Sequence, residues 1–184
     1  MDVKITETAT GRQVPAEIRP ARSEDVILWL DWHSQMPADA ENGHWRWDQY
    51  ILLAEMFPQE LACFALVAEG AIQGLMLLEL KHINDLGEPD IHGLRLSAAP
   101  WNRGAGRRYK GIGTMLLMRA VLLSVEIGFE GRFWLEALPG AEDFYRHIGM
   151  IELPERDPES GLKQFKLDTQ TARAFLKARE EWLR

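Results

Sequence analysis

The segment 108–113, with the sequence Arg-Tyr-Lys-Gly-Ile-Gly, stands directly before an apolar run that covers residues 114–127. A run that is apolar on most faces predicts a largely buried helix. The first N–H groups of a helix lack partners within the helix and therefore bind anions. Glycines at 111 and 113 let the backbone approach such an anion closely. We therefore expect a buried helix whose N-terminus, together with the turn before it, forms a binding site for an anionic ligand.

A second glycine turn, with Gly104 and Gly106, competes for this role. Four bulky residues, 107–110, separate it from the helix, so we expect residues 108–113 to form the anion cradle and the first turn to be an approach loop. Two other glycine motifs are excluded. A Walker loop continues with Lys-Ser/Thr where Ile112 follows Gly111, and a Rossmann fingerprint requires a third glycine where Leu116 stands.

The charge of the chain is unevenly distributed. The net charge is −7, which argues against a general nucleic-acid binder. Residues 91–125 contain no Asp or Glu, and their basic residues are Arg95, Arg103, Arg107, Arg108, Lys110 and Arg119. This pattern fits either a local site for a phosphate-bearing ligand or a solvated basic loop.

Length and composition predict one soluble domain over residues 1–184. No apolar run reaches the ~18 residues that cross a bilayer, and the first residues lack the pattern of a secretory signal. Cys63 is the single cysteine, which excludes an intrachain disulfide and a cysteine-rich zinc site. We therefore expect a cytoplasmic protein that has no membrane segment and no metal site.

The periodicity of the chain predicts an α+β fold with a mostly antiparallel sheet covered by helices. The predicted strands are residues 3–7, 14–19, 63–69, 71–80, 91–99, 132–138, 150–153 and 162–166. The predicted helices are residues 23–35, 44–57, 114–127, 141–148 and a last helix capped by Asp168 or Thr169 that continues to residue 183. We expect His82 and Asp90 in the loop between two strands.

Two segments resemble a known family in the right order. A strand that ends at Pro100, followed by Arg108-x-x-Gly111-x-Gly113 at a helix start, looks like the acetyl-CoA motif of the GNAT superfamily of N-acetyltransferases. Residues 141–150, AEDFYRHIGM, resemble that family's Ala-x-x-Phe-Tyr-x-x-x-Gly-Phe/Met pattern. The resemblance covers residues 16–166 and leaves residues 168–184 as an additional C-terminal helix. It implies the GNAT fold, a mixed and mostly antiparallel sheet flanked by helices.

The sequence departs from the family pattern at two places. Seven residues, 101–107, separate Pro100 from Arg108 where the family usually has two. Arg103, with Gly104 and Gly106 behind it, satisfies the shorter spacing, so the choice of turn depends on adjacency to the helix. The family often has an Asn before the short helix, and residues 138–140 contain none.

The resemblance implies that the anion is the pyrophosphate of acetyl-CoA, held by backbone N–H groups of residues 110–114. The pantetheine arm would pair with the strand end at residues 96–98, where the family's sheet splays. Arg103 or Arg107 would reach the 3′-phosphate, unless these arginines face solvent. The expected cofactor-binding residues are Leu96, Ser97, Ala98, Arg103, Arg107, Arg108, Tyr109, Lys110, Gly111, Ile112, Gly113, Thr114 and Tyr145.

The resemblance also implies the catalytic groups. Tyr145 matches the tyrosine that gives a proton to the departing thiolate, although it could serve only in packing. His92 lies where the family's base often lies, and a histidine titrates near neutrality, which suits proton removal. Glu79 and Glu136 are the alternatives, acting through water, and His92 could instead be structural. A backbone N–H near Ala98 would polarise the thioester carbonyl.

The predicted activity is acetyl transfer from acetyl-CoA to a primary amine by direct attack. The alternative is a catalytically silent CoA-binding or protein-interaction module on the same fold. The acceptor is a small-molecule amine or a protein amine, and a homodimer is one open oligomeric state. The family's acceptor pocket lies against the first two helices, whose aromatic residues could line it or fill the core. These residues are Trp29, Trp32, Trp45, Trp47 and Tyr50.

Overall fold

The computed structural model describes residues 1–84 and 86–183. Within these residues a nine-stranded sheet has the order β6-β1-β2-β3-β4-β5-β7-β9-β8. Its β5 and β7 pair in parallel, and the other neighbours pair antiparallel. The strands are β1 (Asp2–Glu7), β2 (Gln13–Pro20), β3 (Leu61–Ala68), β4 (Ala71–Ile83), β5 (Pro89–Ala98), β6 (Tyr109–Lys110), β7 (Phe133–Ala137), β8 (Ile151–Arg156) and β9 (Lys163–Leu167). The predicted α+β class and mostly antiparallel sheet are confirmed.

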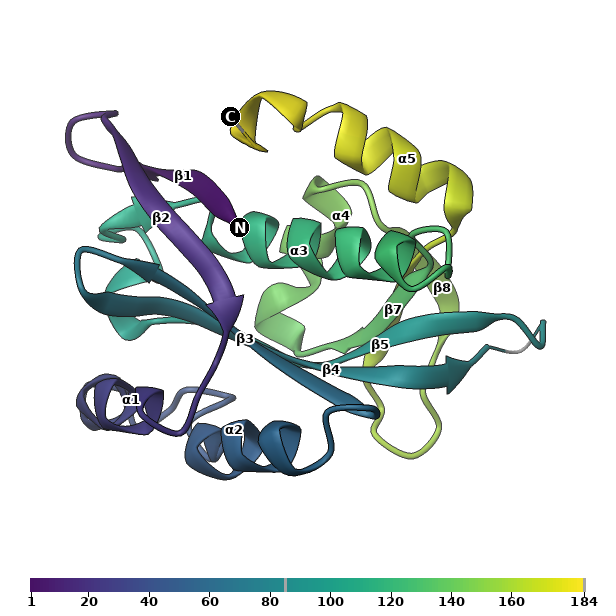
Figure 1. Cartoon of the computed structure of the whole chain (residues 1–184), viewed down its shortest axis with the longest axis horizontal. Helices are drawn as coiled ribbons and strands as arrows, with labels where there is room; N and C mark the ends of the chain where they lie inside the picture. The colour runs from purple at the N-terminus through teal and green to yellow at the C-terminus, as the bar shows by residue number, and fades with distance from the viewer. Residues whose placement is uncertain (85, 184) are drawn as a thin grey trace.

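Helices cover both faces of the sheet (Figure 1). On one face lie α1 (Asp25–Ser34) and α2 (Trp47–Met56). On the other face lie α3 (Ile112–Glu126), α4 (Glu142–His147) and α5 (Thr169–Lys177). Short 3-10 turns are η1 (Pro100–Asn102), η2 (Pro139–Ala141) and η3 (Glu180–Leu183). None of the helices in the described part of the chain is long and apolar enough to span a membrane.

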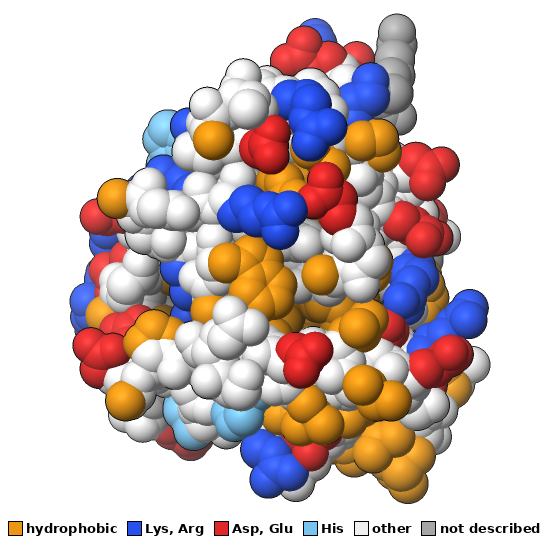
Figure 2. Space-filling model, turned by 90° about the vertical axis from the view of Figure 1, so that its left-hand side faces the viewer, with side chains coloured by type: hydrophobic (Ala, Val, Ile, Leu, Met, Phe, Trp, Pro, Cys, Tyr) orange, Lys and Arg blue, Asp and Glu red, His pale blue; other side chains and the backbone are white. Residues whose placement is uncertain are grey.

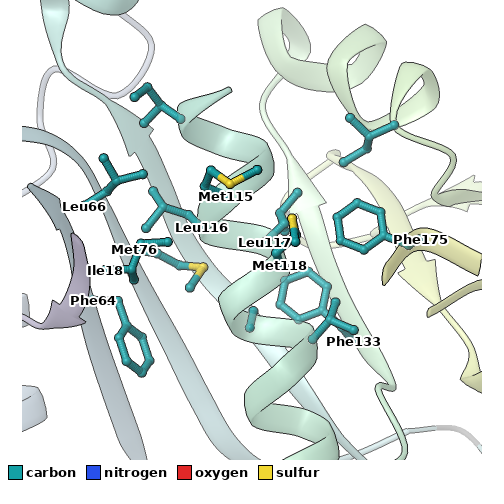
Figure 3. Close-up of a cluster of buried hydrophobic side chains, with 14 of the residues drawn as sticks. Ile18, Phe64, Leu66, Met76, Met115, Leu116, Leu117, Met118, Phe133 and Phe175 are labelled. Atoms are coloured by element: carbon teal, nitrogen blue, oxygen red, sulfur yellow. The ribbon is translucent and has the colours of Figure 1, made fainter. Parts of the chain in front are cut away.

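Two hydrophobic cores lie on opposite faces of the sheet. In the larger core, the α3 residues Met115 to Met118 are surrounded by side chains of the sheet and of α5 (Figure 3). The smaller core lies under α1 and α2 and contains Trp29, Trp32 and Trp47. The predicted burial of the helix after the glycine turn is confirmed, so its N-terminus is fixed against the middle of the sheet.

Three regions of the structure differ from the sequence prediction. The strands β4 and β5 are longer than expected, so His82 and Asp90 pair across them instead of lying in a loop. Their side chains meet at 2.6 Å, from Nδ1 to Oδ1. Residues 109–110 form β6 against β1, which periodicity cannot reveal in two residues. Of the two predicted caps, Asp168 is the one that caps the last helix, but that helix ends at Lys177, and η3 follows as a separate turn.

Candidate functional site

The sheet opens into a fork between β5 and β7. The two strands pair at three positions, from Ile91 with Phe133 to Gly93 with Leu135. Gly93 permits this approach, because a Cβ atom there would lie 2.6 Å from Cζ of Phe133. A bulge follows, in which Leu78 pairs with Gly93 and Leu77 with Arg95, so that Leu94 is the extra residue. Beyond Gly93, within the described chain, β5 has no strand partner on its β7 side. This is the splayed edge that the family resemblance implied.

A cavity of about 270 Å³ fills the fork. It is lined by both diverging strands, by α4, and by the segment before α2. Three of the predicted catalytic residues, His92, Glu136 and Tyr145, line this cavity together. Of the five aromatic residues considered for an acceptor pocket, Trp45 lines it. All four tryptophans, Trp45 included, belong to the core beneath α1 and α2, and Tyr50 packs against it. The expectation that these aromatic residues fill the core is therefore the one observed for most of them.

Tyr145 is held on α4 by aromatic packing. Its ring lies edge-on to Phe144 and tilted against Phe165, and the residue is 5% exposed. Burial raises the pKa of its phenol, so the hydroxyl keeps its proton at neutral pH. Among the described residues the hydroxyl has no hydrogen-bond partner, although it is not sealed from the cavity. It is therefore available as a proton donor to a bound ligand.

His92 and Glu79 form a pair across β4 and β5. The two residues are opposite each other in register, with His92 Nδ1 3.2 Å from Glu79 Oε2. The imidazole also stacks on Trp134, with ring centroids 3.9 Å apart. Burial lowers the pKa of His92, and the Glu79 carboxylate partly offsets this by raising it. When Nδ1 donates to Glu79, Nε2 is left as the basic nitrogen, and Glu79 positions the ring.

Glu136 lies on β7, on the other side of the fork. Burial raises the pKa of this carboxyl, and the charge of Asp157 adds to the rise. The hydrogen bond from Ser160, the charge of Arg95 and the hydrogen bond from Gln164 act in the opposite direction. A carboxylate with a raised pKa is a better base than a solvated one, so the cavity holds a second proton acceptor besides His92.

The glycine turn places the start of α3 beside this cavity. Gly111 caps the helix with φ +92°, a conformation that favours glycine. The first backbone bond of α3 runs from the Met115 N–H to the Gly111 carbonyl, at 2.9 Å. The N–H groups of Ile112, Gly113 and Thr114 therefore precede the helical ladder.

A second cavity of about 200 Å³ lies at this turn. It shares Leu96 with the fork cavity, so the two are neighbours along β5. Its lining includes Leu96, Ala98, Asn102, Arg107, Tyr109, Lys110, Gly111, Ile112, Gly113, Thr114 and Phe144. Gly104 and Gly106 line neither cavity. The geometry thus favours the turn next to the helix as the anion cradle.

Arg103 is held inside the protein by three hydrogen bonds. Its guanidinium donates to the Ala98 carbonyl at 2.9 Å, to Asn42 Oδ1 at 2.8 Å and to Ser97 Oγ at 2.7 Å. Ser97 is buried, and its hydroxyl also accepts from Asn42. These side chains fasten the approach loop to the end of β5. Of the two arginines expected at the 3′-phosphate, Arg107 is the one that lines the cavity at the turn.

Tyr109 and Arg108 brace the turn from its other side. The Tyr109 N–H donates to Asn102 Oδ1 at 3.1 Å, and its hydroxyl donates to Glu69 at 2.6 Å. Arg108 reaches the same carboxylate, also at 2.6 Å. The acid-free stretch therefore meets an acid from the β3–β4 turn, and Figure 2 shows acidic and basic side chains interspersed on that side of the molecule. The expected basic surface is partly neutralised, and both residues stabilise the loop.

Sequence reasoning missed the residues that anchor the long approach loop. Gln73 on β4 is 1% exposed, and its Oε1 accepts from Trp101 at 2.8 Å and from Asn102 at 2.9 Å. This network holds η1 against β4. The turn at residues 108–113 therefore still lies at the start of α3, although seven residues separate it from Pro100. The sequence did contain one signal of this network, a polar Gln within an apolar strand. A buried side-chain amide requires hydrogen-bond partners, so such a Gln indicates polar groups packed against the strand.

No protein-family model matches the chain, and no curated protein matches it. Solved structures do resemble it. A putative acetyltransferase of the GNAT family from Desulfovibrio desulfuricans has a TM-score of 0.60 at 13% identity, covering 84% of this chain and 99% of its own. AtaTR bound with AcCoA has a TM-score of 0.60 at 17% identity, covering 88% and 98%. PaiA N-acetyltransferase from Thermoplasma acidophilum in complex with coenzyme A has a TM-score of 0.57 at 16% identity, covering 82% and 97%.

Proposed function

Because the chain has the fold of the GNAT superfamily of N-acetyltransferases, we propose that it transfers an acetyl group from acetyl-CoA to a primary amine. The observation that carries this proposal is the fork between β5 and β7. Its cavity gathers Tyr145, His92 and Glu136 and adjoins the open N-terminus of α3. The fold neighbours described with AcCoA and with coenzyme A support the same co-substrate.

The residues at the turn fit the phosphate end of acetyl-CoA. The N–H groups of Ile112, Gly113 and Thr114 would bind the pyrophosphate, assisted by the positive end of the helix dipole. Arg107 would neutralise a further phosphate. The pantetheine arm would lie along residues 96–98, where β5 lacks a strand partner on its β7 side within the described chain. The thioester then reaches the fork cavity.

The residues of the fork would supply both proton transfers. His92 Nε2, or Glu136 in its place, takes a proton from the acceptor ammonium, because an amine of pKa ~10.4 is otherwise protonated. The free amine nitrogen bonds to the thioester carbonyl carbon as the carbon–sulfur bond breaks. Tyr145 gives its proton to the departing sulfur, and its phenolate takes up, through water, the second proton that the acylated nitrogen must lose to become an amide, while His92 or Glu136 returns the first proton to solvent. The products are an amide and the free thiol of coenzyme A.

The chain offers no cysteine for a covalent intermediate at this site. Cys63 is the single cysteine, and it lies buried on β3 under the α1–α2 face. Burial raises the pKa of its thiol, which disfavours the nucleophilic thiolate. Direct attack by the amine is therefore the mechanism that these residues support.

The test is to incubate the protein with acetyl-CoA and a broad panel of amines, and to follow free thiol and the mass of the acetylated product. Amine-dependent thiol release that decreases in Tyr145→Phe is the expected result. Coenzyme A binding without turnover on the whole panel would contradict the proposal and support a silent binding module.

A further inference from the structure

Arg95 occupies an unusual position in the fork cavity. It follows the bulge residue Leu94 on β5 and lines the same cavity as His92, Glu136 and Tyr145. Arginines of this acidic protein mostly pair with carboxylates, yet Arg95 takes part in none of the ion pairs among the described residues. Glu136 lines the same cavity, and the charge of Arg95 lowers the pKa of its carboxyl, but the two side chains form no ion pair. Among the described residues the guanidinium therefore has no directly bonded counter-ion in the cavity and can bind one from a ligand.

The hydrogen bonding of Arg95 is incomplete. Its Nη1 donates to the Leu94 carbonyl at 2.5 Å. Its Nε is buried and has no hydrogen-bond partner in the part of the chain that the structure describes. A buried donor without a partner destabilises the fold, so such groups in native proteins usually meet a ligand, an ion or water.

Two aromatic rings hold the guanidinium in place. Its Cζ lies 5.3 Å from the Trp45 ring centroid and 6.0 Å from that of Tyr50. Such contacts orient a guanidinium while leaving its in-plane donors for other partners. Of these donors, Nη2 makes no hydrogen bond among the described residues and is not buried, so it is the donor that a carboxylate in the cavity can reach.

We infer that the fork cavity takes a small acceptor that carries a carboxylate as well as the reacting amine, and that Arg95 binds this carboxylate. This inference rests on the proposed function. The amine must face His92 and Glu136, and Arg95 belongs to the same cavity of about 270 Å³. One small molecule with both groups, such as an α-amino acid, satisfies both sides of the cavity. A carboxylate that accepts from Nη2 would also neutralise the guanidinium charge.

The test measures equilibrium binding by calorimetry to the protein saturated with coenzyme A, which needs no turnover. Three matched sets of probes are compared: glycine, glycinamide and methylamine; leucine, leucinamide and isopentylamine; phenylalanine, phenylalaninamide and phenethylamine. In at least one set, the amino acid is expected to bind about 10- to 100-fold more tightly than both analogues, which is the range for a bond to a charged group. No preference for the carboxylate, or no binding of the amino acid, in all three sets overturns the inference.

Variants assign that preference to Arg95. Arg95→Gln should abolish the preference of the protein for the carboxylate, while Arg95→Lys should keep part of it. Arg46→Gln is the matched control, because Arg46 lies beside Trp45 but is exposed and paired with Asp48 at 2.6 Å. If Arg95→Gln does not fold, the comparison of wild type with Arg95→Lys replaces it. A preference that persists unchanged in both Arg95 variants contradicts the assignment.

Turnover separates this inference from the proposed function. Acetyl transfer to amines regardless of a carboxylate would keep the proposed function and overturn the inference. Carboxylate-dependent binding without any acetyl transfer would overturn the proposed function and leave Arg95 as a carboxylate-binding residue.

Discussion

At the scale of single residues, burial sets the chemistry that each side chain can perform. Tyr145 is enclosed by aromatic rings, and burial raises the pKa of its phenol, which suits a proton donor. The variant Tyr145→Phe keeps the ring and its packing and removes one proton. We expect kcat to fall about 100-fold, the low end for general acid catalysis, because a thiolate is already a fair leaving group. The affinity for coenzyme A should be unchanged, as calorimetry will show.

Two other outcomes for Tyr145→Phe are informative. Full turnover with intact cofactor binding would show that the ring serves in packing alone. A lower melting temperature together with lost binding would show that the hydroxyl supports the structure.

The pH dependence of the reaction tests His92. Burial lowers its pKa from the ordinary value of 6.5, so a larger share of the imidazole is neutral and basic at neutral pH. If His92 is the base, kcat/KM should rise with pH through a midpoint below 6.5, where the imidazolium loses its proton. The acceptor amine titrates far higher, near ~10.4 for an alkylamine, so the two limbs do not overlap.

Two variants identify the group behind that limb. His92→Ala should remove it. Glu79→Gln should move it to lower pH, because the Glu79 carboxylate raises the pKa of His92, and its loss leaves only the weaker effect of Asp90 against burial. A profile that is the same in His92→Ala and in wild type would assign the base to Glu136 instead.

At the scale of elements, the turn before α3 depends on one backbone conformation. Gly111 has φ +92°, and a Cβ in the left-handed region costs about 1–2 kcal/mol. Gly111→Ala should therefore lower the melting temperature and weaken acetyl-CoA binding, since it disturbs the N–H groups that follow. Gly106→Ala is the matched control, because no heavy atom lies within 4 Å of its added Cβ and its φ is not positive. Both effects are read by calorimetry.

A bulkier change at the same turn acts through a neighbouring element. A Cβ at Gly113 would lie 2.9 Å from Cζ of Phe144, so Gly113→Val pushes α4 away from α3. We expect this variant to lose the melting shift caused by acetyl-CoA, and Gly106→Val to keep it. The opposite pattern would assign the cofactor to the upstream glycine turn.

The elements that the sequence predicted are those that depend on local patterns. The buried α3 and the Asp168 cap follow from periodicity and capping chemistry within a few residues. The bulge at Leu94 and the short strand β6 depend on partners far along the chain, and no local pattern encodes them. The features of the candidate site divide in the same way, into those that a local pattern encodes and those that depend on distant residues. The glycine turn was readable from its position before a helix.

The roles of the individual arginines were not readable from the sequence. Arg95 and Arg103 stand in the same acid-free stretch, and of the two only Arg103 was expected to bind a ligand, because of its place in the glycine loop. The fold bonds Arg103 to three internal acceptors and leaves Arg95 in the cavity with an unfilled donor. This difference arises from Asn42 and Ser97, residues 55 positions apart that meet only in the folded chain.

At the scale of the whole molecule, the fork interrupts the sheet that separates the two hydrophobic cores. Strands β4 and β5 pair along nearly their full length, whereas β5 and β7 share three paired positions. Strands β7, β9 and β8 are therefore joined to the rest of the sheet through a short contact, with α3 packed across it. A ligand that fills the fork would contact both β5 and β7, and would thus connect strands β7, β9 and β8 to the rest of the sheet.

Acetyl-CoA should therefore stabilise the whole fold and protect the fork in particular. At 100 times its dissociation constant, a ligand adds about 2.7 kcal/mol to the free energy of unfolding. For a chain of this size, each kcal/mol raises the melting temperature by about 2–4 °C. Scanning calorimetry measures the total, and hydrogen exchange should slow most at residues 94–98 and at β7. Pantetheine, which lacks the pyrophosphate, should give a smaller shift at equal concentration. Protection confined to the loop at residues 103–107, with none in the fork, would contradict binding across the sheet, because a ligand that lies in both cavities should also protect the strands that line the fork.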